Sequence, residues 1–216
     1  MKRLCILLPL LFVLGGCSAL YYSSMKKLGK EKRDILVNRI KDGKEAQEEA
    51  AEKFKTALEA FQEVTKFDGG DLEKMHKKLN KQMEEVDGRA RKVHDRVQSI
   101  DKVANDLFKE WGGEIEKMSE GKLKAESRKL LRDAGNRQET LIRQMRSSEE
   151  KMTPVVQAFR DQVIFLKHNL NARAISSLKK SVLEIDDDVK ALILDIEKSN
   201  READRTIAGL TEASET

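Results

Sequence analysis

A heptad repeat of apolar residues runs through the middle of the chain and restricts what it can fold into. Its first set lies seven residues apart without interruption: Leu72, Leu79, Val86, Val93, Ile100 and Leu107. Its second set follows five of these by four residues: Met83, Ala90, Val97, Ala104 and Trp111. This alternation of four and three indicates a helix with a coiled-coil seam. About 49 residues would span roughly 73 Å as a helix, so the pattern predicts a rod.

The limits of this helix follow from the residues that flank the repeat. The apolar phase continues through residues 112–113, both glycines, to Met118. We therefore expect the two glycines inside the helix and a turn at residues 119–122. At the other end, the glycines at 69–70 permit a helix to close, and Asp71 can cap the helix that follows.

Three further helices are expected around this one. The first covers residues 25–67, the third starts near Leu123, and the fourth follows residues 169–171 and continues to Leu210, before a disordered tail at 211–216. The third carries its seam on Ser127, Leu130, Ala134, Leu141, Met145, Met152, Phe159, Val163, Leu166 and Leu170. Pro154 lies inside it, and proline either kinks or breaks a helix. We favour a kink because the apolar phase survives the proline.

Short turns between long helices require neighbouring helices to run antiparallel. The sequence therefore predicts an all-α fold: an elongated antiparallel bundle of about four long helices with coiled-coil-like packing over residues 25–210. The apolar stripes are narrow, which suits packing of helix on helix better than a helix lying in a membrane surface. Whether the rod folds back as one bundle or pairs with a second molecule stays open at this point.

The N-terminus has the layout of a secretory signal. Lys2 and Arg3 precede an apolar run at residues 4–14, and Gly16 and Cys17 follow after small residues. A membrane-spanning helix needs about 20 apolar residues, so the run is too short for a permanent anchor. We expect residues 1–16 to be removed by cleavage between Gly16 and Cys17.

Residues 14–17 resemble the lipobox of bacterial lipoproteins. The resemblance implies a diacylglycerol and an acyl chain on Cys17, with residues 17–24 as the lipidated cysteine and a short tether. Ser18, where inner-membrane lipoproteins commonly carry aspartate, implies the periplasmic face of the outer membrane. Cys5 leaves with the signal, so no disulfide, thiolate metal site or thiol catalyst is expected in the mature chain.

Charge argues against one broad class of partner. Removal of residues 1–16 takes away Lys2 and Arg3, so the mature chain has 40 of the 42 basic residues and all 38 acidic ones. The charges are interspersed, whereas a nucleic-acid protein shows a clustered basic excess. We therefore expect no nucleic-acid partner, and the 37% of charged residues and 5% of aromatic residues are typical of long helices with narrow seams.

Four segments resemble a bacterial family named domain of unknown function 2959. They are residues 29–37, 107–111, 152–154 and above all 165–172, which read Phe-Leu-Lys-His-Asn-Leu-Asn-Ala. The resemblance extends over nearly the whole mature chain. It implies a helical, often coiled-coil, envelope protein and supplies no catalytic residues.

No set of residues indicates catalysis or a metal site. Glu73 and His76 have the spacing of one di-iron ligand pair, but such a site needs a second pair, and neither His94 nor His168 has a glutamate three residues before it. The acids at 186–188 fan apart on a helix and are expected to be solvated. We expect no enzyme activity, no cofactor besides the lipid on Cys17, and no small-molecule substrate.

Two surfaces are candidate contact sites. A basic cluster next to the tether, able to touch anionic headgroups, comprises Lys26, Lys27, Lys30, Lys32 and Arg33. A polar group after an apolar run, able to dock a partner, comprises Lys167, His168, Asn169 and Asn171. The alternatives are a plain solvated helix start for the first and a helix-to-helix turn capped by asparagines for the second.

These features favour a membrane-anchored, non-enzymatic scaffold or adaptor rod in the periplasm. Its expected partners are the membrane, through the lipid anchor, and either another envelope protein or a second copy of the chain. The alternative is a bundle that binds or handles envelope lipids through its basic cluster and apolar seams.

Overall fold

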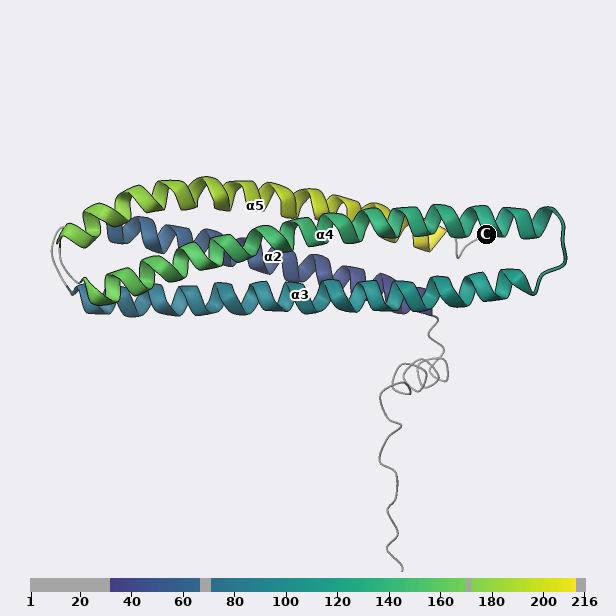
Figure 1. Cartoon of the computed structure of the whole chain (residues 1–216), viewed down its shortest axis with the longest axis horizontal. Helices are drawn as coiled ribbons and strands as arrows, with labels where there is room; N and C mark the ends of the chain where they lie inside the picture. The colour runs from purple at the N-terminus through teal and green to yellow at the C-terminus, as the bar shows by residue number, and fades with distance from the viewer. Residues whose placement is uncertain (1–31, 67–70, 170–171, 213–216) are drawn as a thin grey trace, which may run out of the picture.

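A computed structural model describes residues 32–66, 71–169 and 172–212 of the chain. These residues form four long helices: α2 (Lys32–Thr65), α3 (Leu72–Glu116), α4 (Lys122–His168) and α5 (Ala172–Glu212) (Figure 1). The described part of the chain contains no strand. The expected all-α bundle of long helices is confirmed.

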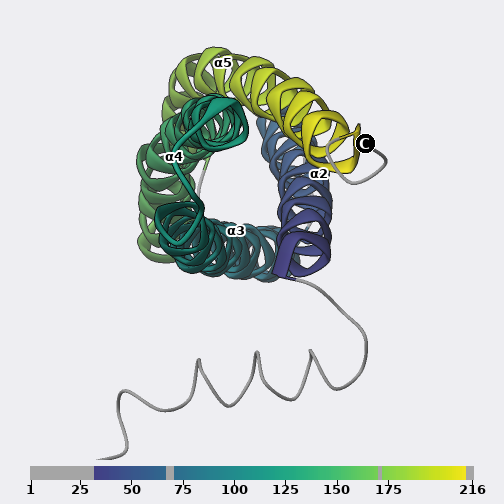
Figure 2. The same ribbon diagram turned by 90° about the vertical axis from the view of Figure 1, so that its right-hand side faces the viewer.

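The four helices close into a ring. Each helix runs antiparallel to the next and packs against it, and α2 also packs against α5, which completes the ring seen end-on in Figure 2. One chain therefore covers its own apolar seams by folding back on itself. The rod thus folds back as one four-helix bundle, which is one of the two arrangements that the sequence left open.

The core is built from residues that recur at alternating steps of three and four. In α3 the heptad residues Leu79, Val86, Val93 and Ile100 are fully buried. Phe159 of α4 stacks between two rings of α2, with centroids 4.9 Å from Phe61 and 6.4 Å from Phe54. Burial of each such aromatic side chain removes a large apolar area from water and stabilises the bundle.

The turns lie where the sequence predicts them. α3 runs through the glycines at 112–113 and ends at Glu116, and α4 begins at Lys122. Asp71 caps α3, because its side chain accepts a hydrogen bond of 3.0 Å from the backbone N–H of Lys74. Residues 25–31 of the expected first helix lie outside the described residues.

The sequence analysis left two possibilities for Pro154, a kink or a break in its helix. The structure excludes a break. α4 is one helix of 47 residues with Pro154 inside it. The proline is exposed, so its ring points away from the core. At the other end of the chain, Thr211 and Glu212 still belong to α5, which corrects the expected start of the tail.

The hairpin of α3 and α4 is longer than the other two helices and projects beyond them (Figure 1). α2 begins beside Glu110, to which Lys32 forms an ion pair of 2.6 Å. α5 ends just beyond Gly209, which lies against the side chain of Arg137. We call residues 111–133, which extend past both, the tip.

The tip explains one wrong prediction. Leu130, placed on the seam by its spacing, is 48% exposed, and Ser127 is only partly buried. The spacing is correct for the helix, but α2 and α5 end before they could cover this part of the seam. None of the described helices is long and apolar enough to cross a membrane.

Candidate functional site

The two surfaces predicted from the sequence lie at opposite ends of the rod. Lys32 and Arg33 open α2, whereas Lys167 and His168 close α4, next to the other end of α2 (Figure 1). The 34 residues of α2 span roughly 51 Å as a helix, so the two surfaces are separated by about that distance. Gly16, Cys17, Lys26, Lys27, Lys30 and Asn171 lie outside the described residues.

At the start of α2, Lys32 of the predicted basic cluster is engaged within the bundle. Lys32 pairs with Glu110 of α3 at 2.6 Å, and Arg33 also has an interaction partner. The charge on Lys32 is therefore matched by a neighbouring carboxylate. This contact fixes the level at which α2 meets α3.

The opposite end of the rod exposes apolar and basic side chains side by side. Ile164 is 50% exposed and Phe165 is 38% exposed, and Lys167 and His168 follow them on the last turn of α4. Cations at a helix C-terminus are favourable beside its partial negative charge. We call these four residues the far-end surface.

Asn169 closes the helix below this surface. Its side-chain amide donates a 2.9 Å hydrogen bond to the carbonyl of Phe165, and its backbone N–H donates one of 3.2 Å to the carbonyl of Leu166. Both carbonyls are unsatisfied in a helix without a cap. Asn169 therefore has the capping role that the sequence offered as the alternative to docking. Of the described residues in that predicted group, Lys167 and His168 are the exposed ones.

A polar layer that the sequence analysis missed crosses the core. Gln47 of α2 donates to the hydroxyl of Ser148 on α4 at 2.6 Å, and the hydroxyl of Ser199 on α5 donates to the Gln47 carbonyl at 3.0 Å. All three side chains are completely buried. Ser148 also donates to the backbone carbonyl of Met145. The layer ties three helices together at one level.

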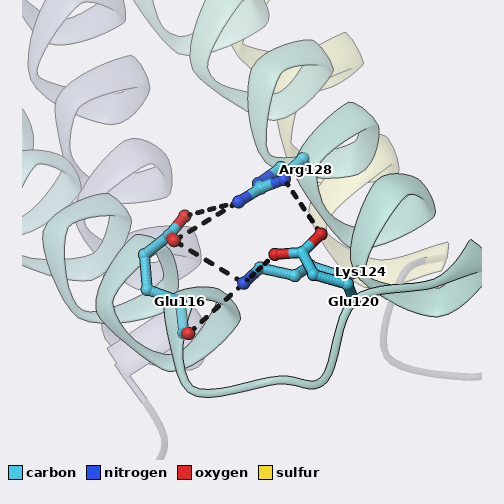
Figure 3. Close-up of polar contacts among 4 residues, drawn as sticks. All are labelled: Glu116, Glu120, Lys124 and Arg128. Atoms are coloured by element: carbon cyan, nitrogen blue, oxygen red, sulfur yellow. Dashed lines mark hydrogen bonds and ion pairs between the residues drawn. The ribbon is translucent and has the colours of Figure 1, made fainter.

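The tip contains a cluster of four charged residues around a buried amine (Figure 3). Lys124 is 5% exposed, and its Nζ lies 2.8 Å from Glu120 and 3.7 Å from Glu116. Arg128 joins the same two carboxylates at 3.9 Å and 3.2 Å. The hydrogen bond from Lys124 lowers the pKa of Glu120. Two cations and two carboxylates thus neutralise one another across the turn.

Ion pairs link neighbouring helices along the sides of the rod. Glu49 of α2 forms ion pairs with both Arg89 and Lys92 of α3, and the hydrogen bond from Lys92 lowers the pKa of Glu49. His94 of α3 lies 2.6 Å from Glu149 of α4, and this hydrogen bond raises the pKa of His94. These contacts hold antiparallel neighbours in register.

The side chains considered above as metal ligands form ion pairs with lysines or lie apart from one another. Glu73 pairs with Lys77 at 2.7 Å rather than with His76, and Asp186 pairs with Lys190. Among residues 32–66, 71–169 and 172–212, no three His, Cys, Asp or Glu side chains are grouped as metal ligands. Buried Nε2 of His76 has no hydrogen-bond partner.

A groove between α2 and α5 is lined by charged side chains in opposite pairs. Lys44 pairs with Asp204 at 2.7 Å, and Lys55 pairs with Glu52 at 2.9 Å. The hydrogen bond to Asp204 raises the pKa of Lys44, which keeps this amine protonated. The groove therefore presents matched ion pairs.

Comparison with known proteins agrees with the resemblance seen in the sequence. A family model described as "Protein of unknown function (DUF2959)" matches residues 21–210, which includes all four described helices up to the last turn of α5. No curated protein matches the chain.

Proposed function

The chain belongs to the DUF2959 family, and from its lipidation signal and its rod-shaped bundle we propose that it is a lipid-anchored scaffold of the bacterial envelope. Cys17 carries the anchor, and the bundle extends from the membrane into the periplasm. The protein acts by holding a partner at a fixed distance and performs no catalysis. Ser18 supports the outer membrane as the place of anchoring.

One observation carries this proposal: the start of α2, which follows the proposed anchor in the chain, and the far-end surface lie at opposite ends of α2. Fourteen residues separate Cys17 from Lys32, where α2 begins. The far-end surface lies roughly 51 Å from Lys32 along α2. A partner bound at Phe165 would therefore be held well away from the lipid surface.

The far-end surface has the chemistry of a small docking site. Exposed Ile164 and Phe165 offer apolar contact, and the adjacent Lys167 and His168 add polar and charged contact. Aromatic residues that are surrounded by polar groups contribute much of the binding energy in protein interfaces. An envelope protein with an apolar patch near acidic side chains would fit this surface.

The packing of the core supports a scaffold over a lipid-carrying bundle. A carrier needs apolar space between its helices, but Phe54, Phe61 and Phe159 are fully buried in the core, and the ring of Phe159 contacts the other two rings. The polar layer of Gln47, Ser148 and Ser199 further interrupts the apolar interior.

Site-specific photo-cross-linking in cells tests the proposal. A photoreactive amino acid replaces Phe165 in the full-length lipoprotein, and a matched control replaces Leu194, which is 63% exposed on the side of α5. We expect a defined envelope-protein adduct from position 165 and none from position 194. The same adduct should be lost when Ile164→Ser is combined with the photoreactive residue at position 165.

Other outcomes would change the proposal. Adducts between two copies of the chain at position 165 would indicate a self-assembled spacer instead of an adaptor. Absence of any adduct at position 165 would remove the docking role. Cys17→Ser should release the protein from the membrane fraction, and continued membrane association of that variant would refute anchoring through Cys17.

A further inference from the structure

The tip projects from the end of the bundle at which the tether enters. Lys32 of α2 is level with Glu110, and α3 continues for six residues to Glu116 before the turn, which adds roughly 9 Å of helix. If Cys17 is acylated, as the proposed function holds, the tip is therefore the part of the bundle that faces the lipid surface.

The tip carries exposed apolar side chains on one helix face. Leu123 is 77% exposed and Leu130 is 48% exposed, and residues seven apart lie on the same face of a helix. Leu123 is the second residue of α4, directly after the turn between α3 and α4, which lies at one end of the bundle (Figure 1). This leucine is where an approaching apolar phase would meet the bundle first.

The charge of the tip is positive once its internal ion pairs are set aside. Glu116 and Glu120 are matched by Lys124 and Arg128 within the cluster of Figure 3. The remaining charged residues of the tip are the cations Lys117, Lys122, Lys129 and Arg132 and the anions Glu114, Glu126 and Asp133. Four cations thus stand against three anions, and two of the cations, Lys117 at the end of α3 and Lys122 at the start of α4, flank the turn next to Leu123.

The tether is long enough for the tip to reach the membrane. Fourteen residues lie between Cys17 and Lys32, and a chain of that length spans at most about 50 Å. The tip projects beyond Lys32 by roughly 18 Å of helix, the length of residues 122–133 of α4, and a turn. The anchor and the tip can therefore contact one surface at the same time.

We propose that the tip binds the surface of a phospholipid membrane that contains anionic headgroups. Lys117 and Lys122 contact the phosphates, and Leu123 enters the boundary between headgroups and acyl chains. The lipid on Cys17 and the tip together make two attachments, which set the rod at a defined angle to the membrane and fix the height of the far-end surface.

Vesicle flotation tests this contact without the acyl anchor. The probe is the non-acylated chain from residue 18, which retains every core residue between Ile35 and Leu210. Vesicles contain phosphatidylglycerol and phosphatidylethanolamine, or phosphatidylcholine alone. We expect binding to the anionic vesicles only, and weaker binding as the salt concentration rises.

A triple substitution in the tip is compared with a matched triple on the side of the rod. The tip variant is K117E/K122E/L123S, and the control is K179E/K180E/L183S on α5, where all three side chains are exposed and Leu183 is 70% exposed. Each lysine near an anionic surface strengthens binding about fivefold, so the tip variant should bind at least about 25-fold more weakly. The control should bind as the unsubstituted chain does.

Three results would overturn the proposal. Equal losses in the two variants would mean that binding depends on overall charge and not on the tip. Absence of binding by the unsubstituted chain, with L123S converting a dimer to a monomer, would identify a second copy as the occupant. Binding that appears only in a chain starting at Lys32 would mean that the preceding residues cover the tip. Because this chain lacks the acyl anchor, none of these results depends on whether Cys17 is lipidated.

Discussion

Glycine has opposite roles at two positions inside these helices. At Gly43 of α2, a Cβ atom would lie 2.6 Å from Cδ1 of Ile100 and 3.2 Å from Cε of Met145, both in the core. At Gly88 of α3, a Cβ would meet nothing within 4 Å. The first glycine leaves room for the ends of the Ile100 and Met145 side chains, whereas the second only weakens its helix.

Gly88→Ala should therefore stabilise the bundle by about 0.5–1 kcal/mol, because alanine loses less backbone entropy on folding. Gly43→Leu should destabilise it by about 1–3 kcal/mol or more, because the added atoms overpack the core. Urea unfolding of the non-acylated chain measures both free energies. A Gly43→Leu variant as stable as the unsubstituted chain would show that α2 does not approach Ile100 so closely.

The ion pair between His94 and Glu149 makes part of the contact between α3 and α4 dependent on pH. Glu149 raises the pKa of His94 above its ordinary value of 6.5, since the carboxylate favours the protonated imidazole. The stabilisation is thus fully present below pH 6.5 and is lost as the pH rises through the folded-state pKa. NMR titration should give a lower pKa for His94 in a Glu149→Gln variant, and an unchanged pKa would contradict the pairing.

At the scale of the helices, the polar layer interrupts three seams at the same level. Gln47 lies seven residues from Ile40 and from Phe54, Ser148 lies seven from Leu141 and from Val155, and Ser199 lies seven from Leu192 and from Thr206. A polar residue at a seam position fixes the register of helices at a cost in stability. The layer is therefore a device that selects one alignment of α2, α4 and α5.

Removal of one partner from this layer should cost more than removal of all three. Ser148→Ala leaves the Gln47 amide without its acceptor in the core, which should destabilise the protein by about 1–3 kcal/mol. The triple variant Q47L/S148A/S199A should be nearly neutral, because no polar group is then left unpaired. Denaturant unfolding compares the two. A loss below about 0.5 kcal/mol for Ser148→Ala, as small as at a surface site, would refute the pairing.

The sequence predicted the helices well because its heptad spacing and its turn residues agree. The cap by Asp71, the turn after Glu116 and the helix that passes the glycines at 112–113 were all predicted correctly. The polar layer was missed, although Gln47, Ser148 and Ser199 stand at seam positions, because spacing along one helix does not show which residues of other helices lie level with it.

The same limit explains what was missed at the ends of the rod. Periodicity placed Leu130 on the seam but could not show that α2 and α5 end before they cover it. Periodicity also could not show that Lys32 pairs with Glu110, or that Lys124 pairs with both Glu116 and Glu120. These contacts depend on how the helices and the turn between them align. The candidate surfaces were found from residue types, and their positions at opposite ends required the fold.

At the scale of the whole molecule, unequal helix lengths divide the rod into a closed ring and an open hairpin. α3 and α4 have 45 and 47 residues, whereas α2 and α5 have 34 and 41. In the ring, every helix is covered by two neighbours (Figure 2). In the tip, residues 111–133, α3 and α4 have only each other, and Ile115 and Lys124 are its buried side chains.

Local stability should follow this division, because segments with few buried apolar contacts open more readily than a packed core. Apart from frayed residues at the helix ends, amide hydrogen exchange in the described helices should be fastest in the tip. It should be slowest around the Phe54, Phe61 and Phe159 rings. Lys124→Met tests what the charge cluster contributes to the tip, since it keeps an unbranched side chain but removes the amine that pairs with Glu116 and Glu120. Exchange should then accelerate in the tip and stay unchanged around the three rings. Equal protection of the tip and the three rings in the unsubstituted chain would mean that the hairpin is covered in solution, by the preceding residues or by a second molecule, and would direct the search for its occupant there.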